Sequence, residues 1–133
     1  MMTDSENAQA GAAPPQDGVA RQEGRPDDVV LVLTNAPDVL LAKRIAHVLV
    51  EESLVACAQV GSPMTSMYLW RGRLEGCEEI PLSFKTTAAL VPALHRRLSQ
   101  LHPYEIPEFL VRGVSAVSAP YLRWVRDNVS RPG

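Results

Sequence analysis

The stretch MTSMYLWRGRLEGCEEIPLSFK, residues 64–85, predicts a long β-hairpin in the middle of the chain. Residues 64–70 carry strand-forming side chains, and the Arg71-Gly72 pair that follows can form a two-residue turn. Over residues 80–85 apolar side chains alternate with more polar ones, a pattern that buries one face of a strand and leaves the other in water. Pro81 lacks the N–H that a strand residue donates, so we expect an edge or a bulge there.

A strand and a helix are predicted on each side of this hairpin. Before it, the aliphatic run VVLVL at 29–33 predicts a buried strand, and a helix over 39–52 and a second strand over 54–60 follow. After it, leucines at helical spacing predict a second helix with Pro92 in its first turn. The segment FLVRGV at 109–114 predicts the last strand.

The order β-α-β-β-α-β, completed by one more helix, predicts a ferredoxin-like α+β sandwich. Ser118 and Pro120 are expected to open the final helix, whose apolar stripe is formed by Leu122, Val125 and Val129. Two helices would cover one face of the sheet. The other face would lack a cover, and such a surface favours self-association.

Composition separates residues 1–28 from the rest of the 133-residue chain. This segment is rich in Ala, Gly, Pro, Gln and acidic residues, so we expect a disordered tail followed by one domain over residues 29–133. The tail has six acidic and two basic residues (net −4) and the remainder nine and eleven (net +2), which predicts no nucleic-acid partner. The lack of a secretory h-region, of a bilayer-spanning run and of a cysteine framework predicts a cytoplasmic protein without membrane contact.

The histidines follow no conventional metal-binding pattern. No His-x-His, His-Glu-x-x-His or Cys-x-x-Cys spacing occurs in the sequence. An ordinary surface or packing role is the favoured interpretation for His47 and His95. His102 differs because it lies in the stretch LHPYEIPE, where a proline and a tyrosine fix its surroundings. For this stretch we favour a structural role, ending the second helix and directing the chain into the last strand, over direct ligation of a metal.

Both cysteines have alternative interpretations. Cys57 lies in a predicted strand, where a small buried hydrophobe is favoured and a soft ligand for Cu(I) is the alternative. Cys77 is expected at an exposed position, although it could bind a metal opportunistically with Glu78 and Glu79.

Three further side chains could contribute to a binding surface. Lys85 precedes Thr86-Thr87, which we expect to open a helix, so it could attract an anion or equally pair with an acid on a neighbouring strand. Tyr68 and Trp70 share one face of their strand and could form an aromatic wall, with core packing as the alternative.

No nucleophile elbow or glycine-rich phosphate loop is present, which argues against an enzyme.

The blocks TNAPD, LVACAQV, MYLWRGRLE, FKTT, HPYEIPE and YLRWV occur in the order in which the CutA family carries similar blocks. The chain resembles this family of divalent-cation tolerance proteins from Val29 to Asn128. The resemblance implies a ferredoxin-like subunit in a homotrimer similar to the PII signalling proteins, with the hairpin reaching neighbouring subunits. It also implies a cytoplasmic location, a link to copper and other divalent metal ions, no organic cofactor and no catalytic activity.

The resemblance also points to particular residues. The copper site attributed to bacterial members corresponds to Thr34, Leu101 and His102, of which only His102 is a metal-binding type, and Cys57 matches a second family cysteine considered for metals. We therefore expect weak copper binding with His102 and Cys57 as the candidate ligands.

Two other functions compete with this prediction. The first is a PII-like sensor that binds a small molecule or an anion in clefts between subunits, lined by Trp70, Lys85, Tyr104, Glu105 and Glu108. The second is an acylphosphatase-like hydrolase on the same fold. It is disfavoured because the sequence shows no anion-cradling arginine loop with an adjacent asparagine.

Overall fold

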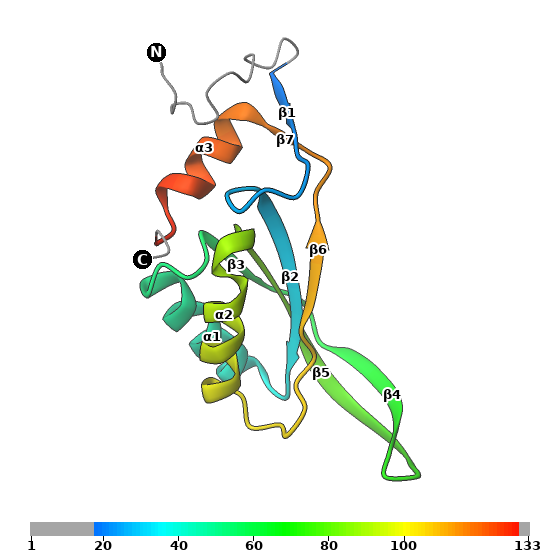
Figure 1. Cartoon of the computed structure of the whole chain (residues 1–133). Coiled ribbons are helices and arrows are strands. Elements are labelled where there is room, and N and C mark those ends of the chain that lie inside the picture. The colour runs from blue at the N-terminus through cyan, green and yellow to red at the C-terminus, as the bar shows by residue number, and fades with distance from the viewer. Residues whose placement is uncertain (1–17, 131–133) are drawn as a thin grey trace.

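Strand β5 (Arg73–Thr87) is the centre of the described chain, residues 18–130 (Figure 1). In this computed structural model it pairs antiparallel with β2 (Val29–Ala36) on one side, and with β3 (Cys57–Val60) and then β4 (Met64–Trp70) on the other. β6 (Leu110–Gly113) pairs with the outer edge of β2, which gives the strand order β3-β5-β2-β6. The remaining elements are β1 (Val19–Arg21), α1 (Val39–Glu51), η1 (Ala88–Leu90), α2 (Val91–Leu101), β7 (Ala116–Ser118) and α3 (Ala119–Asp127).

The predicted ferredoxin-like α+β arrangement is confirmed, and its core lies between the sheet and helices α1 and α2. The Asp38 carboxylate caps α1 by accepting the Leu41 N–H at 2.8 Å. Apolar residues at helical spacing on both helices meet every second residue of the central strands, as their periods require. The fully buried side chains of this core include Val32, Ile45, Leu49, Leu82, Phe84, Leu94 and Leu98.

The opposite face of the sheet is covered at one end only. α3, which begins at the predicted N-cap Ser118, packs Leu122 and Val125 against Val29 and Ala56. Leu31 and Leu33 continue the face of Val29 along β2 and remain partly exposed. Within residues 18–130, most of this second face therefore has no covering layer, as the sequence predicted.

The hairpin turn has the backbone conformation that its sequence requires. Arg71 and Gly72 have φ values of 53° and 79°, so both central residues are left-handed, as in a type I′ turn. The register places Trp70 opposite Arg73 and Leu69 opposite Leu74. The predicted two-residue turn is therefore confirmed.

A β-bulge lies beside Pro81, but on the partner strand. Val60 pairs with Leu82 and Met64 pairs with Glu79, so Ser62 and Pro63 together face the single residue Ile80. The Gly61 N–H donates to the Pro81 carbonyl at 2.8 Å, so the carbonyl of Pro81 faces this partner strand. The N–H that Pro81 lacks would face the same side, where the bulge already interrupts the ladder of hydrogen bonds. This arrangement explains how a proline is tolerated inside the central strand.

Residues 18–28 differ from the tail that composition predicted. β1 pairs antiparallel with β7, and buried Asp28 accepts the N–H groups of residues 23, 24 and 25 at 3.0, 2.7 and 2.9 Å. The Gln22 amide binds both backbone groups of Val29 and the Val114 carbonyl. Polar contacts to the backbone hold this segment, which hydrophobicity alone could not reveal. The prediction of disorder is wrong for residues 18–28, and residues 1–17 lie outside the described residues.

Among residues 18–130, none of the helices combines the length and the apolar character that crossing a bilayer requires.

The bulge makes Gly61 sensitive to substitution. A Cβ added there would lie 2.7 Å from the Pro81 Cγ, part of a rigid ring, so we expect Gly61→Ala to lower the free energy of unfolding by about 1–3 kcal/mol. Gly76→Ala is the matched control, because its Cβ would meet nothing within 4 Å, and its effect should stay within about 0.5 kcal/mol. Urea unfolding measures both, and equal losses would contradict the role assigned to the bulge.

Candidate functional site

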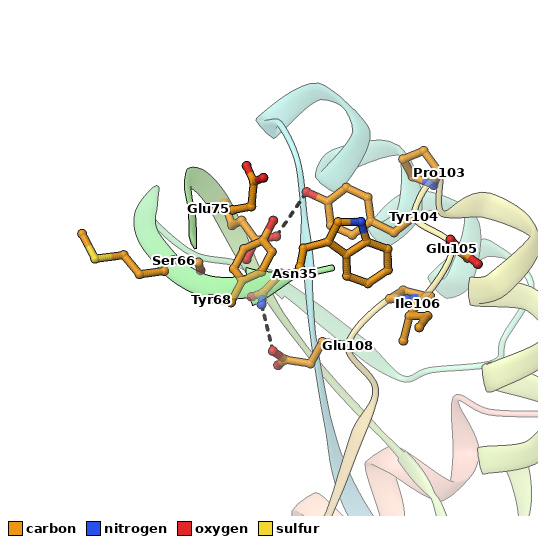
Figure 2. A pocket seen from close by; sticks show the side chains of 13 residues that line it. Asn35, Ser66, Tyr68, Glu75, Pro103, Tyr104, Glu105, Ile106 and Glu108 are labelled. Atoms are coloured by element: carbon orange, nitrogen blue, oxygen red, sulfur yellow. Dashed lines mark hydrogen bonds between the residues drawn. The ribbon is translucent and has the colours of Figure 1, made fainter. Parts of the chain in front are cut away.

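A groove of about 830 Å³ lies between the β4–β5 hairpin and the loop at 102–109 that joins α2 to β6 (Figure 2). Tyr68 and Glu75 reach into it from the hairpin, and Tyr104 and Ile106 reach into it from the loop. Asn35, at the end of β2, contributes to the lining. The volume is within the range of small-molecule sites.

His102 holds the start of this loop. Its Nδ1 accepts the Tyr104 N–H at 3.2 Å, so the ring proton is on Nε2, which donates to the Asn35 carbonyl at 2.6 Å. Only 6% of His102 is exposed. A metal ion could bind either nitrogen only by displacing one of these hydrogen bonds, so the geometry gives His102 a structural role.

Glu108 fixes the other end of the loop to the same strand. Its carboxylate accepts the Asn35 side-chain N–H at 3.0 Å, and its backbone carbonyl accepts the Thr34 hydroxyl at 2.5 Å. Thr34 and Asn35 are both buried. Consecutive residues of β2 therefore position both ends of the loop.

Tyr104 connects the loop to the hairpin across the inner part of the groove. Its hydroxyl donates to the Glu79 Oε2 at 3.2 Å. Burial, followed by the negative charge of Glu79, raises the pKa of Tyr104 to about 12. The phenol is therefore protonated at neutral pH and acts as a hydrogen-bond donor.

The outer end of the groove is bridged at the hairpin turn. The Arg71 guanidinium lies 3.0 Å from the Glu105 carboxylate and 5.3 Å from the centre of the Trp70 ring. Both charged side chains are mostly exposed, so water screens the pair and its contribution to stability is small. The contact nevertheless places a cation over an aromatic face beside a carboxylate.

Tyr68 and Trp70 both line the groove, so the predicted aromatic wall is present. The Tyr68 hydroxyl lies 3.5 Å from the Cys77 Sγ. This hydrogen bond, followed by burial, raises the pKa of Tyr68 to about 12. Cys77 therefore has a tyrosine as its neighbour and is half-buried, in contrast to the exposed position expected.

Lys85 and Cys57 lie outside the groove. They are paired across β5 and β3, and the Lys85 ammonium donates to the Gln59 side-chain oxygen, not to an acid. β5 continues through Thr87, and Thr87 is also the N-cap of η1, so a helix begins there as expected. The Ala88 and Ala89 N–H groups at this helix start donate to the carbonyls of Asp28 and Pro26, so they are not free to bind an anion beside Lys85. Cys57 pairs with Lys85 of β5, and Asn35, the hydrogen-bond partner of His102, pairs with Pro81 of β5. These two positions are four residues apart along β5, or about 13 Å, so Cys57 lies far from His102.

The structure therefore brings together four of the five predicted cleft residues, Trp70, Tyr104, Glu105 and Glu108. It does not bring together the two predicted metal ligands, and residues 18–130 contain no group of three His, Cys, Asp or Glu residues arranged to hold a metal ion. Sequence reasoning missed Asn35 and did not assign Glu79 to the cleft. Strand alternation could have placed Glu79 on the face of Glu75 and Tyr68, whereas no local signal identified Asn35.

Comparisons with known proteins agree with this fold. The sequence profile of the family described as CutA1 divalent ion tolerance protein matches residues 30–128. The divalent-cation tolerance protein CutA of Thermus thermophilus is 38% identical over 98 residues, which covers 74% of this chain and 95% of that protein. Protein CutA of Homo sapiens is 36% identical over 121 residues, or 89% and 68% of the two chains. The crystal structure of CutA from Xylella fastidiosa superposes with a TM-score of 0.75 at 39% identity, covering 77% and 99%.

The Tyr104–Glu79 contact predicts the titration of the groove. We expect Tyr104 to ionise near pH 12, so that the contact stabilises the fold fully below the ordinary tyrosine pKa of 10.0 and loses this contribution as the pH rises through 12. Glu79→Gln should lower this pKa because it removes the second cause of the shift. Glu78→Gln, on the opposite face of the hairpin, should leave it unchanged. Ultraviolet difference titration, with Tyr104→Phe to assign the transition, measures the pKa, and an identical value in Glu79→Gln would refute the contact.

Proposed function

The chain belongs to the CutA1 family of divalent ion tolerance proteins, and from this membership we propose that it works as a cytoplasmic homotrimer in the response to metal ions. The observation that carries the proposal is the family match across the whole sheet, from residue 30 to residue 128. The proposed role is one of binding and not of catalysis.

Two apolar surfaces support the homotrimer. One is the second face of the sheet, where Leu31 and Leu33 have no covering layer within the described chain. The other is the hairpin side that points away from Tyr68, with Met67, Leu69 and Leu74 all more than two-thirds exposed. Exposed apolar surfaces of this kind are typical of protein interfaces. The hairpin projects beyond the sheet, where it can reach another copy (Figure 1).

The oligomeric state tests this proposal directly. Sedimentation equilibrium should give about three times the chain mass of 14.5 kDa. Leu74→Glu, at a side chain that is 76% exposed, should raise the dissociation constant at least about tenfold because it places a charge in the interface. Leu40→Glu, at a leucine on α1 that is 78% exposed, is the matched control and should leave the trimer intact. A monomeric wild type would refute the homotrimer.

The proposal also includes copper binding. Of the two predicted ligands, His102 and Cys57, the geometry supports only Cys57. Both nitrogens of His102 are occupied within the chain, so this residue does not fit a copper site. The Cys57 thiol is half-buried on the sheet face that would lie between copies. We propose that Cu(I), a soft ion that prefers thiolate ligands, binds weakly at Cys57. Because this face of the sheet would lie between copies, assembly of the homotrimer would control the access of the ion to the thiol.

Calorimetry with Cu(I), Cu(II) and Zn(II) separates these ligands. Cys57→Ser should lower the Cu(I) affinity at least about tenfold, and His102→Gln should leave it within about twofold. Cys77→Ser is the control for loss of a thiol elsewhere. The absence of binding by all three ions at micromolar concentration would refute direct metal binding.

A second candidate function is the sensing of a small molecule in the groove. It is supported by the convergence of Trp70, Tyr104, Glu105 and Glu108 on one cavity. Lys85, the cation that was expected to bind an anionic ligand, does not line this cavity, so the groove favours a ligand that is not an anion.

A further inference from the structure

We propose that the groove binds an organic cation, an ammonium group on an aliphatic chain, with the charged end at Glu79. This inference rests on the small-molecule candidate above and names its class of ligand. Its test is separate from the tests of the homotrimer and of metal binding at Cys57. The groove volume of about 830 Å³ is sufficient for such a compound.

The charges that line the groove are of one sign. Four carboxylates contribute to the lining, and among the described residues no lysine or arginine does. Glu105 is paired with Arg71 at the rim. From residues 18–130, Glu79 and Glu108 receive hydrogen bonds only from neutral groups, the Tyr104 hydroxyl and the Asn35 amide. The negative charge is therefore largely uncompensated, and this excludes an anionic ligand.

Glu79 is a buried carboxylate whose hydrogen-bonding capacity is only partly used. It is only 7% exposed, and its Oε1 receives no hydrogen bond from residues 18–130. A buried carboxylate without a cationic partner is costly, because the hydrogen bond from a neutral phenol replaces only part of its lost hydration. An ammonium group entering the groove would supply both the charge and the missing donor.

Aromatic rings form the walls on both sides of the carboxylates. Tyr68 and Trp70 share one face of β4, and Tyr104 faces the same cavity from the loop. Such rings attract cations at their faces and pack well against methylene groups. The chain shows this preference itself, since the Arg71 guanidinium lies over Trp70 and beside Glu105.

The spacing of the carboxylates favours an organic cation over a metal ion. Glu75 and Glu79 are four residues apart on β5, which separates their Cα atoms by about 13 Å. No three metal-binding side chains converge within residues 18–130. A divalent ion needs several oxygen ligands around one point, whereas an alkyl ammonium compound can extend along the groove.

Isothermal calorimetry of the full chain at constant ionic strength tests the proposal. The probes are n-butylammonium and 1,4-diaminobutane, and 1-butanol is the neutral control of similar shape. We expect saturable binding of both amines and at least about tenfold weaker binding of butanol, because only the amines carry the charge. Trp70→Leu, at a half-exposed side chain, should weaken amine binding by about threefold or more.

Glu79→Gln is the decisive variant because it removes the charge and keeps the shape. It should weaken amine binding at least about tenfold, and Glu78→Gln, which removes the adjacent charge on the other face of the hairpin, should change it less than about twofold. Unfolding midpoints near that of the wild type would show that both variants fold. Equal binding of butanol, unchanged affinity in Glu79→Gln, or displacement of the amines by equimolar Mg²⁺ would overturn the proposal. None of these outcomes would alter the sedimentation or Cu(I) results.

Discussion

The unbroken antiparallel pairing of β2 with β5 is the constraint on which the rest of the structure depends. It runs without a register shift from Val29 opposite Thr87 to Ala36 opposite Ile80. Because side chains alternate along both strands, this one register sends one set of aliphatic residues to the helices and leaves the other set on the uncovered face. The pairing stops at Ile80, although β5 begins at Arg73. Within the part of the chain that the structure describes, residues 73–79 therefore have only β4 as a strand partner, and the hairpin projects from the sheet (Figure 1).

The groove follows from this projection and from the end of β2. The hairpin supplies one wall, and the loop at 102–109 supplies the other. That loop is attached at Thr34 and Asn35, which follow Leu33, the residue at which the pairing of β2 with β6 ends. The position of the cavity is thus determined by where two paired strands end, and its acidic character is determined by which face of β5 carries Glu75 and Glu79.

Most of the architecture could be predicted because its signals are local. The Arg71-Gly72 turn, the caps at Asp38 and Ser118, and the first-turn Pro92 each depend on neighbours a few residues away. The ordered segment before Val29 could not be predicted, since the Gln22 amide binds a carbonyl 92 residues away. The same reason hid the pairing of Tyr104 with Glu79 across 25 residues. Lys85 was misplaced because strand register, which no local signal gives, puts it opposite Leu31 and beside Gln59, away from the groove.

Thr34, Leu101 and His102 occupy the positions that the family resemblance associates with copper. In this chain they have structural roles. The Thr34 hydroxyl, in place of a thiol, holds the Glu108 carbonyl, and Leu101 packs against the core. His102 uses both ring nitrogens to connect Asn35 with Tyr104. All three side chains therefore support the loop that forms one wall of the groove. A metal ion at Nδ1 would release the Tyr104 N–H, and one at Nε2 would release the Asn35 carbonyl, so ligation by His102 would in either case remove one of the two hydrogen bonds that hold the start of the loop.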